Sequence, residues 1–260
     1  MSKEKLDKAL NRTLESGQKV FIPYIMAGDG GLDSLKEQIL FLQEAGVTAI
    51  EIGVPFSDPV ADGPTIQEAG KRSLQHGTSL RIVLDYLKDL KPVVRIPLIV
   101  MTYLNPVFKY GIENFCTNAL QSGISGVIIP DLPLEQSELI RDHLQENEIA
   151  LIQLATLTSS EERMKKIAKA SEGFLYAVTV NGITGERSTV DTGEGLEHYM
   201  KRIKKHSNTP VLAGFGISTP EQVRKIGAAC DGVIIGSKII SLWKEGKRNE
   251  IKELIQATQQ

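Results

Sequence analysis

The sequence predicts an α/β protein, a single (β/α)8 or TIM barrel with an extra N-terminal helix. Short β-branched apolar runs end in Gly, Asp, Pro or Asn, and an amphipathic helix-like segment follows each run. This unit recurs eight times in 260 residues without a linker or a change of composition. Apolar and polar residues alternate little within these runs, which is typical of parallel strands covered by helices. A doubly wound open sheet is the competing architecture, and both the strand count and the length favour the barrel.

The predicted strands occupy residues 20–26, 47–53, 96–101, 126–130, 149–154, 174–180, 210–214 and 231–236. We treat residues 1–260 as one domain. The helical spacing of Leu6, Leu10 and Leu14 predicts that residues 1–17 form a helix that packs on the barrel. The residues after Gly246 are expected to form a terminal helix that frays.

Two connections are longer than the others: 54–78 after the second strand, expected to be a long loop, and 180–195 after the sixth, expected to be a mobile loop. Both follow the C-terminal ends of strands, where barrel enzymes build their active sites. Long loops at that end are typical of lids and partner surfaces.

The bulk composition narrows the class of protein. Thirty Lys and Arg against 32 Asp and Glu give a net charge of −2. The chain as a whole therefore has no positive electrostatic field that would attract nucleic acid or an anionic membrane. No stretch approaches the roughly 20 apolar residues of a membrane span. Cys116 and Cys230 stand in unrelated contexts, which indicates a reducing cytoplasm without disulfides. The four histidines have no metal-ligand spacing, so no metal is expected.

Glu51 is the first candidate catalytic residue. It lies inside the second strand, and alternation places it on the face of Ala49 and Val47, opposite Ile50 and Ile52. If the isoleucines meet the helices, Glu51 points into the barrel. The alternative is a glutamate paired with a buried base, but no basic residue lies within a predicted strand. A buried, unpaired carboxyl has a raised pKa, which suits a general acid or base.

The next connection contains two further carboxylates. Asp62 precedes Gly63 and Pro64, and Asp58 precedes Pro59. Either aspartate could simply form a turn, because Asp before Gly or Pro is common in turns. Spacing alone does not choose between a catalytic and a structural role for them.

Two glycine turns near the C-terminus predict a phosphate site. Gly214 and Gly216 follow the seventh strand, and Gly236 and Ser237 follow the eighth. Small residues let backbone amides approach an anion, and barrels commonly bind phosphate after strands 7 and 8. Thr184 and Gly185 of the sixth loop could close over the same group. Aromatic and apolar residues near the mouth suggest an apolar pocket, although such residues often belong to the core: Tyr24, Met101, Tyr103, Tyr176 and Phe215.

Several motifs together resemble the tryptophan synthase alpha subunit family. The most specific is EIGVPFSDPVADGPTIQ at 51–67, with FIPYIMAGD before it and PDLPLEQ, GITG, GFGIS and DGVIIGS after it, in order over nearly the whole chain. The chain departs from the usual pattern at GDGG (28–31) and at TVN before GITG. The resemblance implies a lyase that cleaves indole-3-glycerol phosphate to indole and glyceraldehyde 3-phosphate by a retro-aldol reaction.

The resemblance also assigns roles to residues. Glu51 matches the acid/base catalyst, and Asp62 matches the aspartate that accepts the indole N–H. Asp58 instead matches a partner contact. Tyr176 matches a tyrosine of the pocket, and Thr184 a threonine that meets the loop-2 aspartate. The phosphate-binding positions match Gly185, Phe215, Gly216, Gly236 and Ser237. Tyr24 and Met101 are further candidates for the substrate pocket.

The family's partner is a beta subunit that carries pyridoxal phosphate, so the resemblance implies no cofactor on this chain and an α2β2 complex. The expected contacts are Pro55, Asp58, Asn105, Asp131, Pro133 and the sixth loop. Two alternatives stay open: a stand-alone lyase that releases indole, and a catalytically weak barrel that mainly activates the beta subunit.

Overall fold

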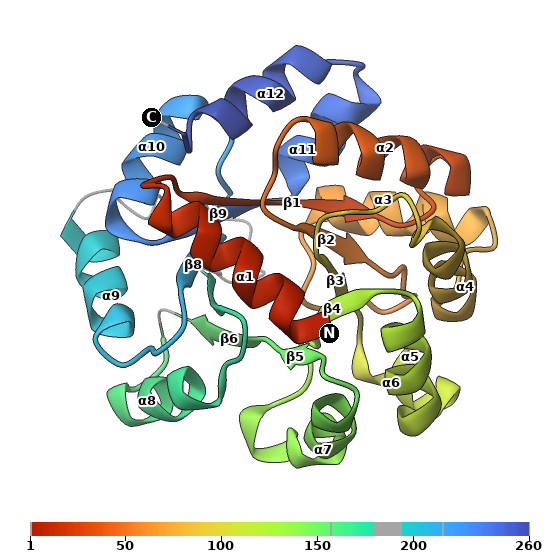
Figure 1. The fold of residues 1–260 in the computed structure, drawn as a ribbon, viewed down its shortest axis with the longest axis horizontal. Helices are drawn as coiled ribbons and strands as arrows, with labels where there is room; N and C mark the ends of the chain where they lie inside the picture. Colours follow the sequence, from red (N-terminus) through yellow and green to blue (C-terminus); the bar gives the residue numbers. More distant parts are fainter. Residues whose placement is uncertain (1, 157, 179–193, 215, 260) are drawn as a thin grey trace.

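A closed parallel β-barrel forms the centre of the computed structural model, which describes residues 2–156, 158–178, 194–214 and 216–259 (Figure 1). Nine strands lie in the order β5-β4-β3-β2-β1-β9-β8-β7-β6. Only Ile152 separates β5 from β6, and its N–H donates to Val127 O (3.0 Å). The two are therefore halves of one barrel strand, and the predicted eight-stranded barrel is confirmed.

The strands start close to the predicted apolar runs and are mostly shorter. Their bounds are β1 Val20–Met26, β2 Ile50–Gly53, β3 Leu98–Met101, β4 Ile124–Ile128, β5 Ala150–Leu151, β6 Gln153–Thr156, β7 Leu175–Val178, β8 Val211–Gly214 and β9 Gly232–Ile235.

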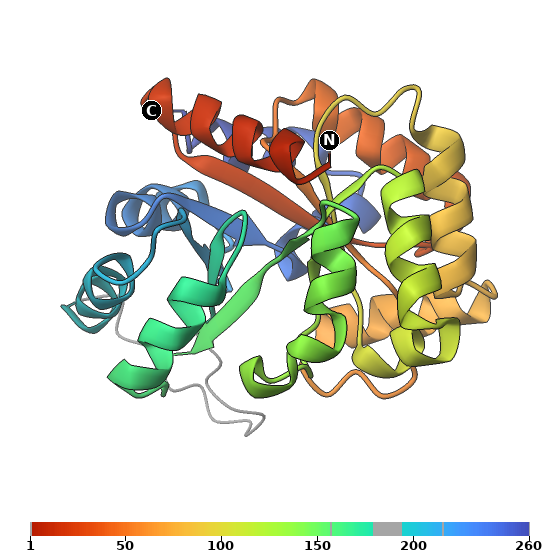
Figure 2. The ribbon, with the colours of Figure 1, turned by 60° about the horizontal axis from the view of Figure 1, so that its bottom comes forward.

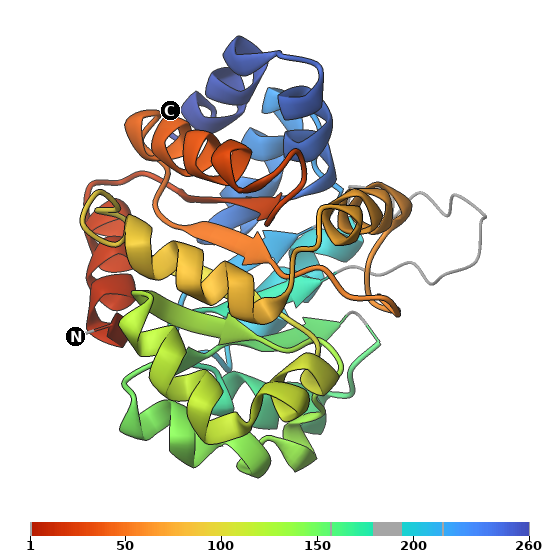
Figure 3. The same cartoon turned by 90° about the vertical axis from the view of Figure 1, so that its right-hand side faces the viewer.

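Helices form the outer layer around this barrel (Figures 1 and 3). Their apolar faces and the outward strand residues make one large buried cluster. The helices are α2 Leu32–Glu44, α3 Pro64–Gln75, α4 Leu80–Leu90, α5 Leu104–Tyr110, α6 Ile112–Gln121, α7 Glu138–Glu146, α8 Glu161–Ala170, α9 Glu194–Lys204, α10 Pro220–Ala229, α11 Ser237–Lys244 and α12 Arg248–Gln256, with a short 3-10 helix at Leu134–Gln136.

The extra helix α1, Ser2–Glu15, lies across one end of the barrel (Figures 1 and 2). Leu6 and Leu10 are fully buried in a cluster with Ile22 of β1 and with Phe174, which directly precedes β7. A Cβ at Gly173 would approach Leu6 Cδ2 to 2.8 Å, so the glycine makes room for the helix. Because α1 fills the end where strands begin, a ligand has access only from the end where they finish.

Two expectations need correction. About half of the connection 54–78, expected to be a loop, is helix α3, because Pro64 begins a helix whose buried face includes Ala69 and Ser73. The terminal helix, expected to fray, is packed, since α12 buries Ile251 and Leu254. The mobile loop predicted at 180–195 lies outside the described residues up to 193, and α9 begins at 194.

No helix in the described part of the chain is long and apolar enough to cross a membrane. Within the same residues, no group of three or more His, Cys, Asp and Glu side chains could hold a metal ion.

Candidate active site

Glu51 lies in the barrel interior. It is the second residue of β2, in register with Tyr24 of β1 and Ile99 of β3. Ile50 and Ile52 belong to the outer cluster with the helices, so the alternation predicted for β2 holds around Glu51. Val47 does not share the inward face, because it precedes the strand and packs in the outer cluster.

Among the described residues, no cationic side chain forms an ion pair with the Glu51 carboxyl. The residue is 1% exposed, and among the described residues its Oε2 has no hydrogen-bond partner. Burial raises the pKa of Glu51 to about 8, and the negative charge of Asp62 adds to the shift. The group is therefore mostly protonated at neutral pH and can donate a proton.

Two glycines let tyrosine side chains reach the same region. A Cβ at Gly53 would overlap the Tyr24 hydroxyl, and a Cβ at Gly214 would overlap the Tyr176 ring. Burial raises the pKa of both tyrosines well above the ordinary value, and the charges of Glu51 and Asp62 act in the same direction. The two hydroxyls therefore stay neutral and add no charge to the site.

Asp62 lies at the mouth of the barrel, ahead of α3, and is partly exposed. Burial raises the pKa of Asp62 to about 6, and a hydrogen bond from Tyr103 works in the opposite direction. The buried Tyr103 hydroxyl also accepts from Ala61 N–H (2.9 Å), and its ring stacks on Phe56 at 5.1 Å between centroids. Tyr103 thus fixes this part of the connection, and Asp62 is mostly ionised at neutral pH.

One cavity of about 630 Å³ contains both carboxylates. Asp58, in contrast, is exposed and accepts a hydrogen bond from Ser57 Oγ (2.6 Å). The structure therefore distinguishes two aspartates that spacing left equivalent. The wall around the carboxylates is mainly apolar and aromatic, with Tyr24, Ile66, Met101, Pro130, Leu154 and Tyr176.

The glycine turns after β8 and β9 line the same cavity through Gly216, Gly236 and Ser237. The two helices that follow them differ at their N-termini. Thr219 and Gln222 form a capping box that satisfies the start of α10. Gly236 offers α11 no side-chain cap, and the first helical bond there is Ile240 N–H to Gly236 O (3.1 Å). The amides of the first turn of α11 are available to an anion.

Three predicted site residues, Thr184, Gly185 and Phe215, lie outside the described residues. Lys238 and Ile66 also line the cavity, although neither was predicted from a sequence pattern. Lys238 directly follows the Gly236-Ser237 turn, and this position is the sequence feature from which its place at the cavity could have been predicted. The sequence predicts only that Tyr103 lines the pocket, because its contact with the 54–78 connection depends on the fold.

The residues expected to touch a partner follow the C-terminal ends of β2, β3 and β4, in loops and, for Asn105, in the first turn of α5. Asp58, Asn105, Asp131 and Pro133 are exposed, whereas Pro55 is buried. The Asp131 carboxylate accepts from Leu104 N–H (2.9 Å) and so fixes the start of α5. Two large apolar side chains near these residues are exposed, Val60 at 65% and Phe108 at 48%.

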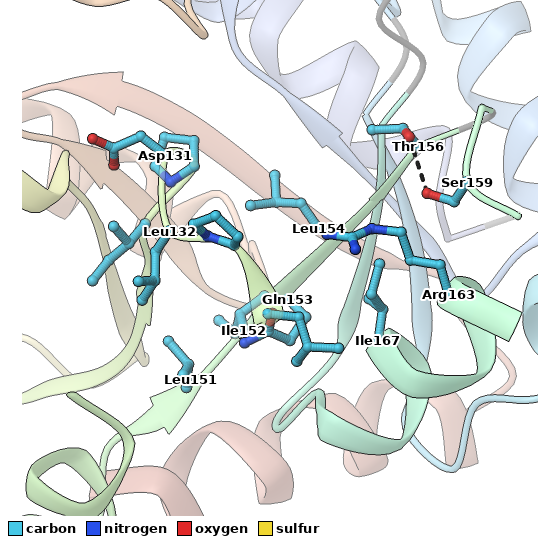
Figure 4. Close-up of a pocket in the computed structure, with 14 residues that line it drawn as sticks. Asp131, Leu132, Leu151, Ile152, Gln153, Leu154, Thr156, Ser159, Arg163 and Ile167 are labelled. Carbon is cyan, nitrogen blue, oxygen red and sulfur yellow. Dashed lines mark hydrogen bonds between the residues drawn. The ribbon is translucent and has the colours of Figure 1, made fainter. Parts of the chain in front are cut away.

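A second cavity of about 410 Å³ adjoins the first and shares Pro130, Leu154 and Thr156 with it (Figure 4). Its walls are the turn at 130–134, β5, β6 and α8. Arg163 of α8 lines it and is paired with Glu135 (2.5 Å). Glu51 does not line this cavity, so the acid–base chemistry belongs to the first one.

A TIM barrel with two carboxyl groups and two glycine turns in one cavity at its C-terminal mouth has the architecture of a barrel enzyme that acts on a small molecule. The family model described as tryptophan synthase alpha chain matches residues 10–260. The chain belongs to this family, the carbon–carbon lyases of tryptophan biosynthesis that cleave indole-3-glycerol phosphate. In this family, pyridoxal phosphate is carried by the beta subunit.

Individual relatives agree with this assignment. The chain is 50% identical over 255 residues to the tryptophan synthase alpha chain of Oceanobacillus iheyensis, covering 98% of this chain and 97% of that one. It is 52% identical over 251 residues to that of Bacillus cereus, covering 96% of each. The crystal structure of tryptophan synthase subunit alpha from Legionella pneumophila superposes with a TM-score of 0.90 at 30% identity, covering 98% of both chains. A chain of Mycobacterium tuberculosis tryptophan synthase gives 0.89 at 30%, covering 97% of both. The predicted family, fold and lyase activity are confirmed.

Proposed function

We propose that this chain cleaves indole-3-glycerol phosphate in the cavity described above, with Glu51 as the acid/base catalyst and Asp62 as the stabilising anion. The observation that carries the proposal is that both carboxyls line one cavity, where burial raises the pKa of Glu51 to about 8 and that of Asp62 to about 6. Environments that separate two carboxyl pKa values in this way identify the acid and the base of a site.

The reaction begins with proton transfer from Glu51 to indole C3, which places positive charge on the ring. Asp62 accepts the ring N–H and stabilises that charge through a charge-assisted hydrogen bond. The ionised Glu51 then removes the proton of the hydroxyl next to the ring. The C–O bond becomes a carbonyl, the carbon–carbon bond breaks, and its electron pair returns to the ring. Indole and glyceraldehyde 3-phosphate leave, and Glu51 is again protonated.

The walls of the cavity suit the two ends of this substrate. Tyr24, Met101 and Tyr176 provide apolar and aromatic surface for indole beside Glu51. In the same cavity, Gly216, Gly236 and Ser237 bring backbone amides to the phosphate. Gly185 and Phe215 join the phosphate site, and Thr184 meets Asp62, by the resemblance.

The proposed partner is a tryptophan synthase beta subunit in an α2β2 complex, and the proposed compartment is the cytoplasm. The exposed Asp58, Asn105, Asp131 and Pro133, with Val60 and Phe108, form the proposed contact surface. Pro55 would stabilise the loop that carries Asp58 from its buried side. The buried free thiols of Cys116 and Cys230 suit a reducing compartment.

The test is an assay of the purified chain with indole-3-glycerol phosphate, with and without a beta subunit. We expect cleavage that the beta subunit stimulates, and a complex on size-exclusion chromatography. Full turnover without any complex would show the stand-alone lyase instead. Absence of cleavage with strong stimulation of the beta subunit would show an activator and overturn the proposal.

A further inference from the structure

The second cavity, of about 410 Å³, is not used by the proposed cleavage, and it lies where the main-chain pairing of the barrel changes partner (Figure 4). β4 pairs with Ala150 and Leu151, and its last hydrogen bond to this strand is from Ile152 N–H to Val127 O. From Gln153 on, the strand pairs with β7 instead. Among the described residues, the segment after β4 and β6 therefore have no main-chain hydrogen bonds to each other, and both line the cavity.

Gln153, the first residue of β6, lines this cavity from the side of the helices. Leu151 and Ala155, which lie on the same face of the chain by alternation, belong to the apolar cluster between the strands and the helices. Ile152 and Leu154 lie on the opposite face and pack in the cluster inside the barrel. Gln153 thus places a carboxamide where the neighbouring outward residues are apolar.

The side-chain amide of Gln153 has no hydrogen-bond partner in the part of the chain that the structure describes, although the residue is only 7% exposed. Its main chain, by contrast, is satisfied, since Gln153 N–H donates to Ser171 Oγ (3.3 Å) and β6 pairs in register with β7. Burial of an amide without a partner is unfavourable unless a molecule in the cavity replaces the lost hydrogen bonds to water. The amide is therefore available to a ligand.

The hydroxyl groups beside Gln153 are already paired. Thr156 Oγ1 lies 3.1 Å from Ser159 Oγ, as the dashed line in Figure 4 shows. Thr156 Oγ1 also lies 3.1 Å from Thr158 Oγ1. Gln153 is consequently the polar side chain with the most hydrogen-bonding capacity left for a ligand.

Charge does not favour an anion or a cation in this cavity. The Arg163 guanidinium forms a two-point ion pair with Glu135, with distances of 2.5 and 3.2 Å. The Asp131 carboxylate accepts from Leu104 N–H (2.9 Å) and points away from the other labelled side chains (Figure 4). The remaining walls are mainly apolar. A neutral molecule therefore suits the cavity better than a charged one.

We propose that this cavity is a second small-molecule site, which takes a neutral, mainly apolar molecule that carries a carboxamide or lactam group. The Gln153 amide presents a carbonyl acceptor and an N–H donor side by side, so it can form two hydrogen bonds with such a group. The apolar body of the ligand contacts Leu132, Leu134 and Ile167. The volume lies in the range of small-molecule pockets. The inference does not depend on the proposed cleavage, and its test needs no turnover.

The test is calorimetric titration of the complete chain with benzamide and with acetophenone. The two probes have nearly the same shape, but acetophenone carries a methyl group where benzamide carries the NH₂ group. We expect benzamide to bind the unmodified chain about 3- to 10-fold more tightly, as for the gain of one hydrogen bond. Undetectable binding of benzamide, or equal affinities for the two probes, would overturn the proposal.

A substitution at Gln153 shows where the amide is recognised. Gln153→Met keeps the length of the side chain and removes its amide, so the two probes should bind this variant within twofold of each other. Gln145→Met, at an exposed position of α7 that does not line the cavity, is the matched control and should keep the preference for benzamide. A preference that survives Gln153→Met would place the amide-binding group elsewhere, for instance at Asp62, and overturn the proposal.

Melting curves without ligand separate a binding role of Gln153 from a structural one. Gln153→Met and Gln153→Leu each remove a buried amide that has no partner among the described residues, so at least one of them should be as stable as the unmodified chain. A lower melting temperature for both variants would show that the amide has a structural partner, such as a bound water, and would contradict a site that is open to a ligand.

Discussion

The substitution Glu51→Gln tests the central feature of the site, because it removes the ionisable group and keeps the size and polarity of the side chain. A glutamine cannot protonate indole C3 or accept the hydroxyl proton. General acid–base catalysis typically contributes about 10² to 10⁴ in rate, so we expect kcat to fall by at least this factor. The assay is cleavage of indole-3-glycerol phosphate by the complex.

The same substitution has a consequence for stability, which follows from the pKa of Glu51. Below about pH 4.5 the carboxyl is protonated in both the folded and the unfolded chain. As the pH rises toward about 8, the unfolded chain loses this proton while the folded chain keeps it, so the free energy of unfolding falls. The difference between the two pKa values corresponds to roughly 5 kcal/mol at full ionisation.

Urea denaturation at pH 5 and at pH 9 measures this effect. Glu51→Gln should have nearly the stability of the unmodified chain at pH 5 and be several kcal/mol more stable at pH 9. Glu162→Gln, at an exposed position of α8, is the matched control and should not change this difference. If Glu51→Gln gained no relative stability between pH 5 and pH 9, or kept full activity while folded, the reasoning about a buried, unpaired acid would be refuted.

Three further results are expected. The pH profile of kcat/KM should be bell-shaped, falling below about pH 6 as Asp62 is protonated and above about pH 8 as Glu51 ionises; a flat profile from pH 5 to 9 would contradict these assignments. Tyr103→Phe removes the hydrogen bond that lowers the pKa of Asp62, so the acidic limb should move to higher pH, whereas Tyr110→Phe, whose hydroxyl contacts Asn118 outside the cavity, should leave it in place. Leu6→Ala should reduce the free energy of unfolding by about 2 to 5 kcal/mol in urea denaturation. The substitution should change kcat little, because Leu6 fills the end of the barrel opposite the cavity. A loss of kcat with unchanged stability would contradict a purely structural role for Leu6.

Local patterns in the sequence were sufficient to predict the repeating strand–helix architecture and to predict that the Glu51 side chain points into the barrel. Strand alternation is a property of the backbone, so Ile50 and Ile52 on one face place Glu51 on the other. The turn after β9 was also readable, because Gly236 and Ser237 stand between an apolar run and a helix. In these cases the information lies within a few consecutive residues.

The tertiary structure decided what depends on distant segments. Spacing leaves Asp58 and Asp62 equivalent, whereas in the folded chain Tyr103 contacts the 54–78 connection, Asp62 lines the cavity and Asp58 stays exposed. Helix α3 was not predicted either, because its buried face is defined by packing against β1 and α11, which are distant in the sequence.

By itself, then, the sequence determined the succession of strands and helices and which side of β2 carries the acid, since both follow from local periodicity. The tertiary structure decided which acidic groups share one cavity, namely Glu51 and Asp62. The physical reason is that a pKa near 8 for Glu51 arises from burial and from a charge that is 11 positions away in the chain. Such an environment exists only after the barrel has closed.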